Sequence, residues 1–144
     1  MTVELKQIEV GSPLHAAEQR LRDEVLRRPL GRTLSAAEIE RDPTGTHFAA
    51  VRRGEVVACV GLYPQGEGLL RLRQMAVAPH LQGQGVGARL LAFAEDWART
   101  RGYSEIELHA RLSAVGFYER KGYAQEGDVF KEISIPHIVM RKTL

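Results

Sequence analysis

The 144-residue sequence has one cysteine, Cys59, and no long apolar run. A single cysteine cannot form an internal disulfide or a cysteine-rich metal site, and its apolar surroundings favour a buried, inert thiol. No window approaches the roughly 18 to 20 uninterrupted apolar residues of a transmembrane helix. The first residues lack the apolar core of a signal peptide. From these absences we expect a cytoplasmic protein with no membrane partner.

The sequence also lacks an excess of charge of one sign. The 20 Lys+Arg and 18 Asp+Glu residues leave a formal net charge of +2 at pH 7. Nucleic acids and anionic membranes are usually bound by numerous, clustered basic residues, so we expect no nucleic-acid partner. His15, His47 and His80 are scattered without the spacing of metal ligands, and we expect no metal site.

Linkers rich in Pro, Gly or Ser, low-complexity tracts and internal repeats are missing as well. Hydrophobic residues make up 44% and charged residues 26% of the chain, which is close to ordinary globular usage and excludes wholesale disorder. We therefore expect residues 1–144 to form a single domain.

The N-terminal part of the chain has the pattern of one strand and two helices. Residues 3–10 form the predicted strand. Ser12, followed by a proline, is a typical cap for a helix that ends near Pro29. Ser35 and Glu38 have the spacing of a capping box, which predicts a short second helix.

The rest of the chain predicts an antiparallel meander followed by a βαβ crossover and two final strands. The predicted strands are residues 48–52, 55–63, 69–78 and 103–109, and two more strands after residue 123. A long helix follows residues 82–87, and a short helix includes residues 114–118. The order βααβββαβαββ indicates an α/β (α+β) fold with a mixed, mostly antiparallel sheet.

The third strand of the meander changes phase along its length. Leu70 and Leu72 are apolar at even positions, whereas Met75 and Val77 are apolar at odd positions. A strand with a strict period of two cannot do this without an extra residue. We therefore expect a bulge or splay at residues 73–74, next to a functional site.

Three glycines, Gly83, Gly85 and Gly87, stand at the start of the long helix. A helix start presents unpaired backbone N–H groups and the positive end of the helix dipole. Without side chains, these glycines would let an anion approach the N–H groups closely. The loop is thus either a phosphate cradle or an ordinary glycine-rich turn.

A dinucleotide-binding loop is the first alternative for such a cradle. Gly83-x-Gly85-x-x-Ala88 satisfies the dinucleotide fingerprint, and Glu107 lies at roughly the distance of a ribose-binding acid. The fingerprint should follow its strand immediately, but residues 79–82 intervene. The preceding meander also does not open a βαβ unit, so the context disfavours this interpretation.

Two motifs resemble those of the GCN5-related N-acetyltransferase (GNAT) family. Gln82-x-x-Gly85-x-Gly87 is similar to the acetyl-CoA motif of the family, and it lies between a bulged strand and a long helix as expected there. Residues 114–123, AVGFYERKGY, resemble the second signature of the family. The resemblance implies an acyl-CoA N-acyltransferase fold over residues 1–144, with a splayed strand and helices on both faces of the sheet.

The resemblance also implies how acetyl-CoA, the acyl-donor cosubstrate, would bind. The backbone of Met75, Ala76 and Val77 would pair with pantetheine and polarise the thioester carbonyl. The pyrophosphate would be held by the backbone N–H groups of Gln82, Gly83, Gln84, Gly85, Val86, Gly87 and Ala88. A bulge agrees with this role, because it frees donors from strand pairing for a developing oxyanion.

Three side chains are candidates for proton transfer. Tyr118 matches the general-acid tyrosine of the family, and a tyrosine hydroxyl, protonated at neutral pH, can donate to a leaving thiolate. Glu107 and His109 lie on one face at the end of the strand that borders the expected cleft, and either could be the base. The chain departs from the family at Arg111, where an asparagine is often found.

The sequence therefore predicts an N-acetyltransferase that moves an acetyl group from acetyl-CoA to a primary amine by direct attack. The acceptor, a small molecule or a protein amine, is not identified by the sequence. The alternative is a non-catalytic acyl-CoA-binding sensor or interaction domain. A homodimer is left open as the assembly state.

Overall fold

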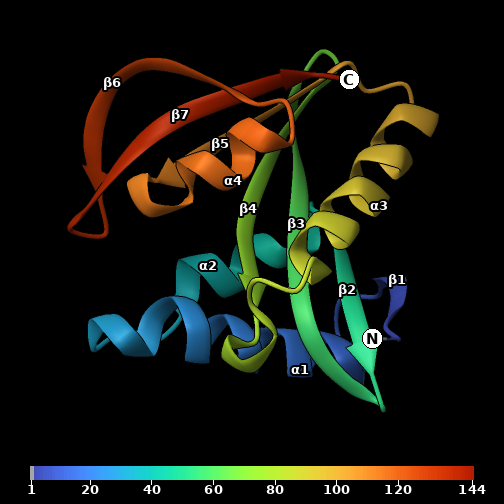
Figure 1. Cartoon of the computed structure of the whole chain (residues 1–144). Helices are drawn as coiled ribbons and strands as arrows, with labels where there is room; N and C mark the ends of the chain where they lie inside the picture. The colour runs from blue at the N-terminus through green and yellow to red at the C-terminus, as the bar shows by residue number, and fades with distance from the viewer. Residues whose placement is uncertain (1) are drawn as a thin grey trace.

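The computed structural model describes residues 2–144, whose strands all join one mixed sheet (Figure 1). The elements are β1 (Glu4–Ile8), α1 (Pro13–Arg22), α2 (Ala36–Arg41), β2 (Thr46–Arg52), β3 (Glu55–Gly66), β4 (Leu69–Val77), α3 (Val86–Thr100), β5 (Glu105–Arg111), α4 (Val115–Arg120), β6 (Ala124–Glu132) and β7 (Ile135–Thr143). The predicted order βααβββαβαββ and the predicted fold class are confirmed.

The sheet has the strand order β1-β2-β3-β4-β5-β7-β6. The pairing of β4 with β5 is parallel, and the other pairings are antiparallel. Helices α1 and α2 lie on one face of the sheet, whereas α3 and α4 lie on the other (Figure 1). Across residues 2–144, every helix is too short or too polar to span a bilayer.

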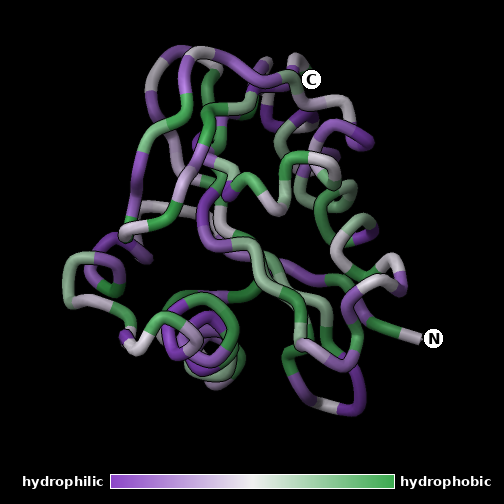
Figure 2. Tube along the Cα trace, turned by 60° about the vertical axis from the view of Figure 1, so that its left-hand side comes forward, coloured by the Kyte–Doolittle hydropathy of each residue, from purple (hydrophilic) through white to green (hydrophobic). Residues whose placement is uncertain are grey.

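The core lies where the central strands meet the buried face of α3. Leu62, Leu70 and Ile106 of the sheet and Leu90 and Leu91 of α3 are almost fully buried. Hydrophilic and hydrophobic stretches alternate along the helices (Figure 2). Burial of each such leucine or isoleucine side chain contributes about 1.5 to 3 kcal/mol, and this packing fixes the start of α3 against the sheet.

Both predicted helix caps form. The Ser12 hydroxyl accepts a hydrogen bond from the His15 N–H at 3.2 Å, and the Ser35 hydroxyl accepts one from the Glu38 N–H at 3.1 Å. The Glu38 carboxylate accepts a bond from the Gln74 side chain at 2.6 Å, whereas a capping box would direct it back to the Ser35 N–H. This glutamate therefore ties α2 to β4.

The first predicted helix is less regular than its pattern suggests. Helix α1 ends at Arg22, and a π-helical turn (Asp23–Arg27) and a short 3-10 turn (Arg28–Leu30) follow. Proline at position 29 cannot donate a helical hydrogen bond, and its ring clashes with the preceding turn, so a regular α-helix cannot continue through it. The π-helical turn carries Arg27 toward the far end of the sheet.

The predicted bulge in β4 is confirmed at Gln74. Cys59 pairs with Ala76 and Gly61 with Arg73, so one residue of β3 lies opposite two residues of β4. Gln74 has a φ of 54°, which is the left-handed region that a side chain adopts only at a local cost. The extra residue puts Val77, opposite Ala58, on the same face of the sheet as Leu72, opposite Leu62, although Val77 is half-buried and Ala76 is the buried residue of this segment.

Strands β4 and β5 separate after a short parallel ladder. Among the described residues, their pairing runs from Leu69 with Glu105 to Leu72 with Leu108 and stops there. Beyond that point, β4 continues through the bulge while β5 continues to Arg111, two residues past the predicted strand end. The two strands therefore separate at the end of the sheet that holds the bulge.

Candidate functional site

A cleft of about 1110 Å³ occupies the region where β4 and β5 separate. Its walls come from the bulged end of β4, the loop before α3, α4, the end of β5, the π-helical turn after α1, and α2. The bulge, the glycine loop and the second sequence signature thus meet in one space, although they are far apart in the chain.

Most of the predicted cofactor-binding residues line this cleft. They are Met75, Ala76, Val77, Gln82, Gly83, Gly85, Val86, Gly87 and Ala88. Gln84 is absent from the lining within residues 2–144; its side chain instead donates to the His80 carbonyl at 3.2 Å. Because β4 has lost β5 as a neighbour here, the edge of its backbone at Met75–Val77 is open toward the cleft.

The start of α3 has the geometry of an anion cradle. Gly85 caps the helix with a φ of 82°, and Gly83 has a φ of 79°. The first helical hydrogen bond runs from the Arg89 N–H to the Gly85 carbonyl at 3.1 Å, so the N–H groups of Val86, Gly87 and Ala88 precede the helical ladder. A Cβ on Gly83 or Gly85 would meet open space, which leaves these amides accessible.

Gly87 has a different role from the other two glycines. A Cβ at this position would lie 3.2 Å from Val77 Cγ2 and 3.4 Å from Met75 Cε. Glycine therefore lets the first turn of α3 approach the bulged strand closely. The Gln82 side chain adds a second tie, because it donates to the Val77 carbonyl at 3.0 Å.

Tyr118 projects from α4 into the same cleft. Its side chain is 7% exposed, and its hydroxyl donates to the Met75 sulfur at 3.7 Å. Burial raises the pKa of this hydroxyl, so the group is protonated at neutral pH. The structure therefore places a proton donor beside the open strand edge.

The two candidate bases are in different environments. The Glu107 carboxylate lies 2.6 Å from Arg141 Nη2 and 3.5 Å from Arg71 Nη1, and within residues 2–144 it is not part of the cleft lining. His109 lines the cleft. Its Nδ1 atom lies 2.6 Å from Arg71 Nη2 and 2.9 Å from Glu132 Oε1. Of the two, only His109 is placed to exchange a proton with a molecule in the cleft.

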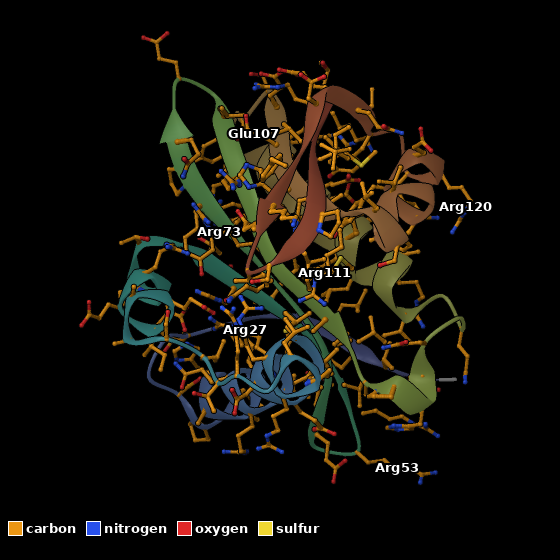
Figure 3. All side chains as sticks on the ribbon, turned by 90° about the vertical axis from the view of Figure 1, so that its left-hand side faces the viewer. Arg27, Arg53, Arg73, Glu107, Arg111 and Arg120 are labelled. Carbon is orange, nitrogen blue, oxygen red and sulfur yellow. The ribbon has the colours of Figure 1, made fainter. Side chains whose placement is uncertain are left out.

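Arginine side chains dominate the part of the cleft nearest α1 and α2 (Figure 3). They are Arg27, Arg41, Arg71, Arg73 and Arg111. Arg111 stood out in the sequence as a departure from the family pattern, and Arg71 and Arg73 lie on β4 just before the bulge. Arg27 and Arg41 carried no signal, because only the folded chain brings the helical segments against β4.

His137 also lines the cleft, close to the strand end. It is almost fully buried, and its Nδ1 atom lies 2.7 Å from the Ile135 carbonyl. Its Nε2 atom lies 3.8 Å from Glu132 Oε2. These contacts fix the turn between β6 and β7 and hold Glu132 near His109.

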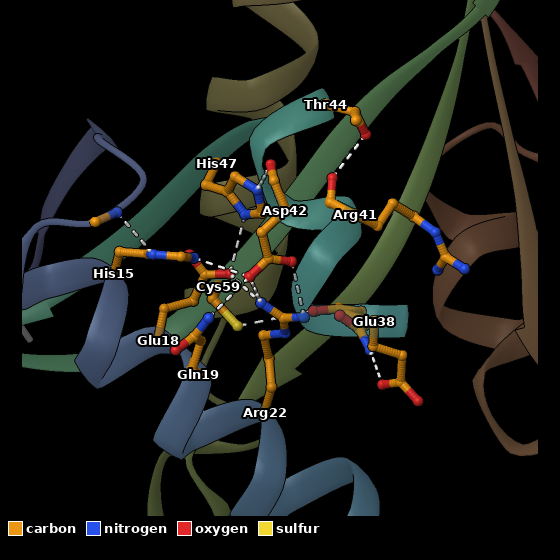
Figure 4. Close-up of polar contacts among 12 residues, drawn as sticks. His15, Glu18, Gln19, Arg22, Glu38, Arg41, Asp42, Thr44, His47 and Cys59 are labelled. Atoms are coloured by element: carbon orange, nitrogen blue, oxygen red, sulfur yellow. Dashed lines mark hydrogen bonds and ion pairs between the residues drawn. The ribbon is translucent and has the colours of Figure 1, made fainter. Parts of the chain in front are cut away.

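A buried polar cluster connects α1 to the segment that follows α2 (Figure 4). The Asp42 carboxylate accepts hydrogen bonds from Arg22 at 2.8 and 3.1 Å, and it lies 2.8 Å from His15 Nε2. Glu18 Oε1 lies 3.2 Å from Arg22 and 3.1 Å from His47 Nδ1. No local pattern indicates that His15 and His47 meet, because they are separated by about thirty residues of chain.

The cluster shifts the pKa of its members. Burial alone would raise the pKa of Asp42, but hydrogen bonds from Arg22 and His15 outweigh burial and lower the pKa to about 2. Burial would lower the pKa of His47, whereas its contact with Glu18 raises the pKa above the ordinary value. Charged partners therefore favour the ionised forms of Asp42 and His47.

Cys59 lies next to this cluster and is fully buried. Burial raises the pKa of its thiol well above the ordinary value. The expected inert thiol is therefore consistent with its surroundings. Within the described part of the chain, no group of three His, Cys, Asp or Glu side chains is arranged to hold a metal ion.

An amide cradle at the start of a helix, an open strand edge and a buried tyrosine thus lie together in one cleft of an α/β protein, an arrangement that suits a phosphate-bearing ligand. Residues 10–123 match the Acetyltransferase (GNAT) family, and the chain belongs to this family. The family resemblance of the two sequence motifs is thereby confirmed.

Curated relatives align with part of this chain. An aminoalkylphosphonate N-acetyltransferase from Salmonella typhimurium is 36% identical over 92 residues, which are 58% of this chain and 60% of that protein. The uncharacterised protein YyaT from Bacillus subtilis is 27% identical over 74 residues, which are 51% of this chain and 50% of that protein. The chain thus spans about half to three fifths of the length of these relatives.

Solved structures match the whole fold. A candidate N-acetyltransferase from Lactobacillus plantarum superposes with a TM-score of 0.82 at 29% identity, over 97% of this chain and 98% of that chain. A GNAT family acetyltransferase from Elizabethkingia anophelis with acetyl-CoA bound gives a TM-score of 0.76 at 20% identity, over 99% and 98% of the two chains. These matches agree with the splayed sheet described above.

Proposed function

We propose that this protein transfers an acetyl group from acetyl-CoA to a primary amine by direct attack, with Tyr118 as the general acid. The observation that carries the proposal is the position of the Tyr118 hydroxyl. It is buried in the cleft and lies 3.7 Å from the sulfur of Met75, beside the open edge of β4.

The donor half of the cleft fits acetyl-CoA. The N–H groups at the start of α3 would bind the pyrophosphate, because they are unpaired and lie at the positive end of the helix dipole. The open backbone edge at Met75–Val77 would pair with pantetheine and hold the thioester carbonyl. A preorganised donor to a developing oxyanion contributes about 3 to 4 kcal/mol to transition-state stabilisation.

Proton transfers complete the reaction. The amine nitrogen forms a bond to the acetyl carbon, the carbon–sulfur bond breaks, and Tyr118 donates a proton to the leaving thiolate. We assign the base to His109, because it lines the cleft, and Glu132 Oε1, 2.9 Å from its Nδ1 atom, would stabilise the ring once it has taken up a proton; in the neutral ring Nδ1 accepts from Arg71 Nη2 at 2.6 Å. Glu107 holds Arg71 and Arg141 and would serve in positioning.

The relatives support the type of reaction. The Salmonella relative is named for N-acetylation of aminoalkylphosphonates, and a structural neighbour is an aminoglycoside 6'-N-acetyltransferase complexed with coenzyme A. We extend N-acetylation, with acetyl-CoA as the donor, to this chain. We further expect it to act in the cytoplasm, as a monomer or a homodimer, and sedimentation of the purified protein distinguishes these two states.

A direct assay tests the proposal. The purified protein is incubated with acetyl-CoA and a panel of primary amines, while a thiol reagent follows the release of CoA and mass spectrometry follows acetylated amine. We expect thiol release that requires both the protein and an amine. Firm binding of acetyl-CoA without release of thiol for any amine would favour the sensor alternative instead.

A further inference from the structure

Positive charge is in excess in the part of the cleft nearest α1 and α2, which we take as the side where the acceptor binds. Of the acidic residues in the lining, Glu38 pairs with Arg27 at 3.1 Å, and Glu132 lies 2.9 Å from His109. Outside the lining, Glu107 pairs with Arg71 at 3.5 Å. Each of these carboxylates thus has a partner of its own, and the charge of Glu132 also acts on Arg71 and Arg73 without an ion pair to Arg73.

Arg41 and Arg73 line the cleft without a carboxylate partner in the described part of the chain, and the Arg73 guanidinium lies over the Tyr63 ring, 5.8 Å from its centroid. Among residues 2–144, neither forms an ion pair with a carboxylate within 4.0 Å. The Nε atom of Arg73 is buried and has no hydrogen-bond partner among the described residues, and neither does that of Arg71. Arg111 differs from them, because it already donates to the Leu26 carbonyl at 3.0 Å.

These guanidinium groups lie close enough to repel one another. Burial lowers the pKa of Arg73, and the charges of Arg71 and Arg41 lower it further. Figure 4 shows the Arg41 side chain extending away from the buried polar cluster of α1, and both Arg41 and Arg73 line the cleft. A protein keeps partly buried like charges together at a cost in stability, which an anion between them would offset.

From this arrangement we infer that the acceptor amine carries a carboxylate or phosphonate group, which Arg41 and Arg73 bind. This inference rests on the proposed function. Arg73 lies two residues before Met75, across the bulge at Gln74, and both residues line the same cleft. We therefore expect a small acceptor whose amine and anionic group are separated by a few bonds.

Three amines of similar length distinguish the groups that the site recognises. They are β-alanine, 2-aminoethylphosphonate and the uncharged propylamine. Loss of a hydrogen bond to a charged partner usually changes affinity by about tenfold to a hundredfold. We expect kcat/KM for at least one anionic amine to exceed that for propylamine by tenfold or more, and the better of the two anionic amines identifies carboxylate or phosphonate.

Matched variants assign this preference to the arginines. In Arg73→Gln and Arg41→Gln, the preference for the anionic amine should fall by about tenfold, while the affinity for CoA stays the same. Arg73→Lys keeps the charge and should retain part of the preference. Arg53→Gln removes the same charge at the turn between β2 and β3, far from the cleft (Figure 3), and should change nothing. The ratio of two substrates in one variant is independent of the folded fraction.

A binding measurement separates this inference from the proposed function. The same amines are titrated calorimetrically into the protein saturated with CoA. If no amine is acetylated, but an anionic amine binds and Arg73→Gln abolishes its binding, the anion site stands and the transfer reaction falls. If propylamine is acetylated as well as the anionic amines, the reaction stands and the anion site falls. Weaker binding of CoA to Arg73→Gln, with the substrate preference unchanged, would also overturn the anion site.

Discussion

The hydroxyl of Tyr118 faces the sulfur of Met75 at 3.7 Å, across the gap between α4 and the bulged strand β4. These two residues are 43 positions apart in the chain. Their contact joins the bulged strand to the second sequence motif, because Met75 follows the bulge and Tyr118 belongs to that motif. A thioester held along β4 would therefore have its leaving sulfur close to the tyrosine proton.

Tyr118→Phe tests the proposed acid. The substitution removes one hydroxyl and keeps the ring, so packing against Met75 and the affinity for acetyl-CoA should change little. General-acid groups contribute about 10² to 10⁴ to the rate, and kcat should fall by this factor. Steady-state kinetics with a competent amine measure the loss, and a loss confined to kcat places the interaction in the transition state.

The control for this variant is Tyr103→Phe. Tyr103 stacks on Trp97 at the far end of α3, with ring centroids 6.2 Å apart, and is remote from the cleft. Its hydroxyl should be dispensable for turnover. Equal rates for Tyr118→Phe and the parent protein would remove the tyrosine from the mechanism.

Gly85→Glu tests the phosphate cradle. The new side chain would enter open space in front of the amides of α3, where it would block an anion and repel it electrostatically. We expect the affinity for CoA to fall by more than tenfold, as measured by calorimetry.

Gly54→Glu is a matched control for the cost of the backbone conformation. Gly54 also has a positive φ, 78°, and open space around it, but it lies in the turn between β2 and β3. Both variants should lose about 1 to 2 kcal/mol of stability, because a side chain strains the left-handed conformation. Unchanged affinity for CoA in Gly85→Glu would exclude the loop as the phosphate site.

The bulge and the glycine loop could be predicted because each leaves a local pattern. A strand has a period of two, so the change from Leu72 to Met75 required an inserted residue, and the structure places that residue at Gln74. A glycine with positive φ before a helix leaves a similar mark in the sequence. Local constraints of this kind do not depend on the rest of the fold.

The buried cluster around Asp42 could not be predicted, because its members meet only in the folded chain. His15 and Asp42 are 27 residues apart, and Glu18 and His47 are 29 residues apart. Only the pair of Glu18 and Arg22, four residues apart on α1, has a recognisable spacing. The exclusion of Glu107 from the cleft had the same cause, since its partner Arg141 comes from the last strand.

Acetyl-CoA should stabilise the fold, whereas NAD should not. A ligand that binds one site of the folded state adds about 2.7 kcal/mol at a concentration of 100 times its Kd. Thermal melts with each ligand measure the difference, and CoA alone should stabilise as well, because the proposed cradle contacts the phosphates. Stabilisation by NAD alone would point to the dinucleotide interpretation of the glycine loop and end the transferase proposal.

Asp42→Asn should strongly destabilise the protein at neutral pH. Asp42 is fully buried and neutralises Arg22, which is 1% exposed. Removing one partner of a buried ion pair costs about 3 to 5 kcal/mol, and we expect a loss at the lower end of this range, because Arg22 keeps its contact with Glu18 at 3.2 Å. Urea denaturation at pH 7 measures the loss. Asp96→Asn, which breaks an exposed pair with Arg99 on α3, should cost less than about 1 kcal/mol.

The same carboxylate should make the stability of the protein depend on pH below about 4. Its pKa is about 2 in the folded protein, against 3.8 as its ordinary value. The lowered pKa contributes stability that is fully present above pH 4 and is lost as the pH falls toward 2, by about 2 kcal/mol in total. Urea denaturation of the parent protein and of Asp42→Asn from pH 5 to pH 2 isolates the contribution of Asp42 to the free energy of unfolding, because both proteins contain all the other carboxylates. Parallel pH curves for the two proteins would show that Asp42 titrates in the folded state as it does in the unfolded chain.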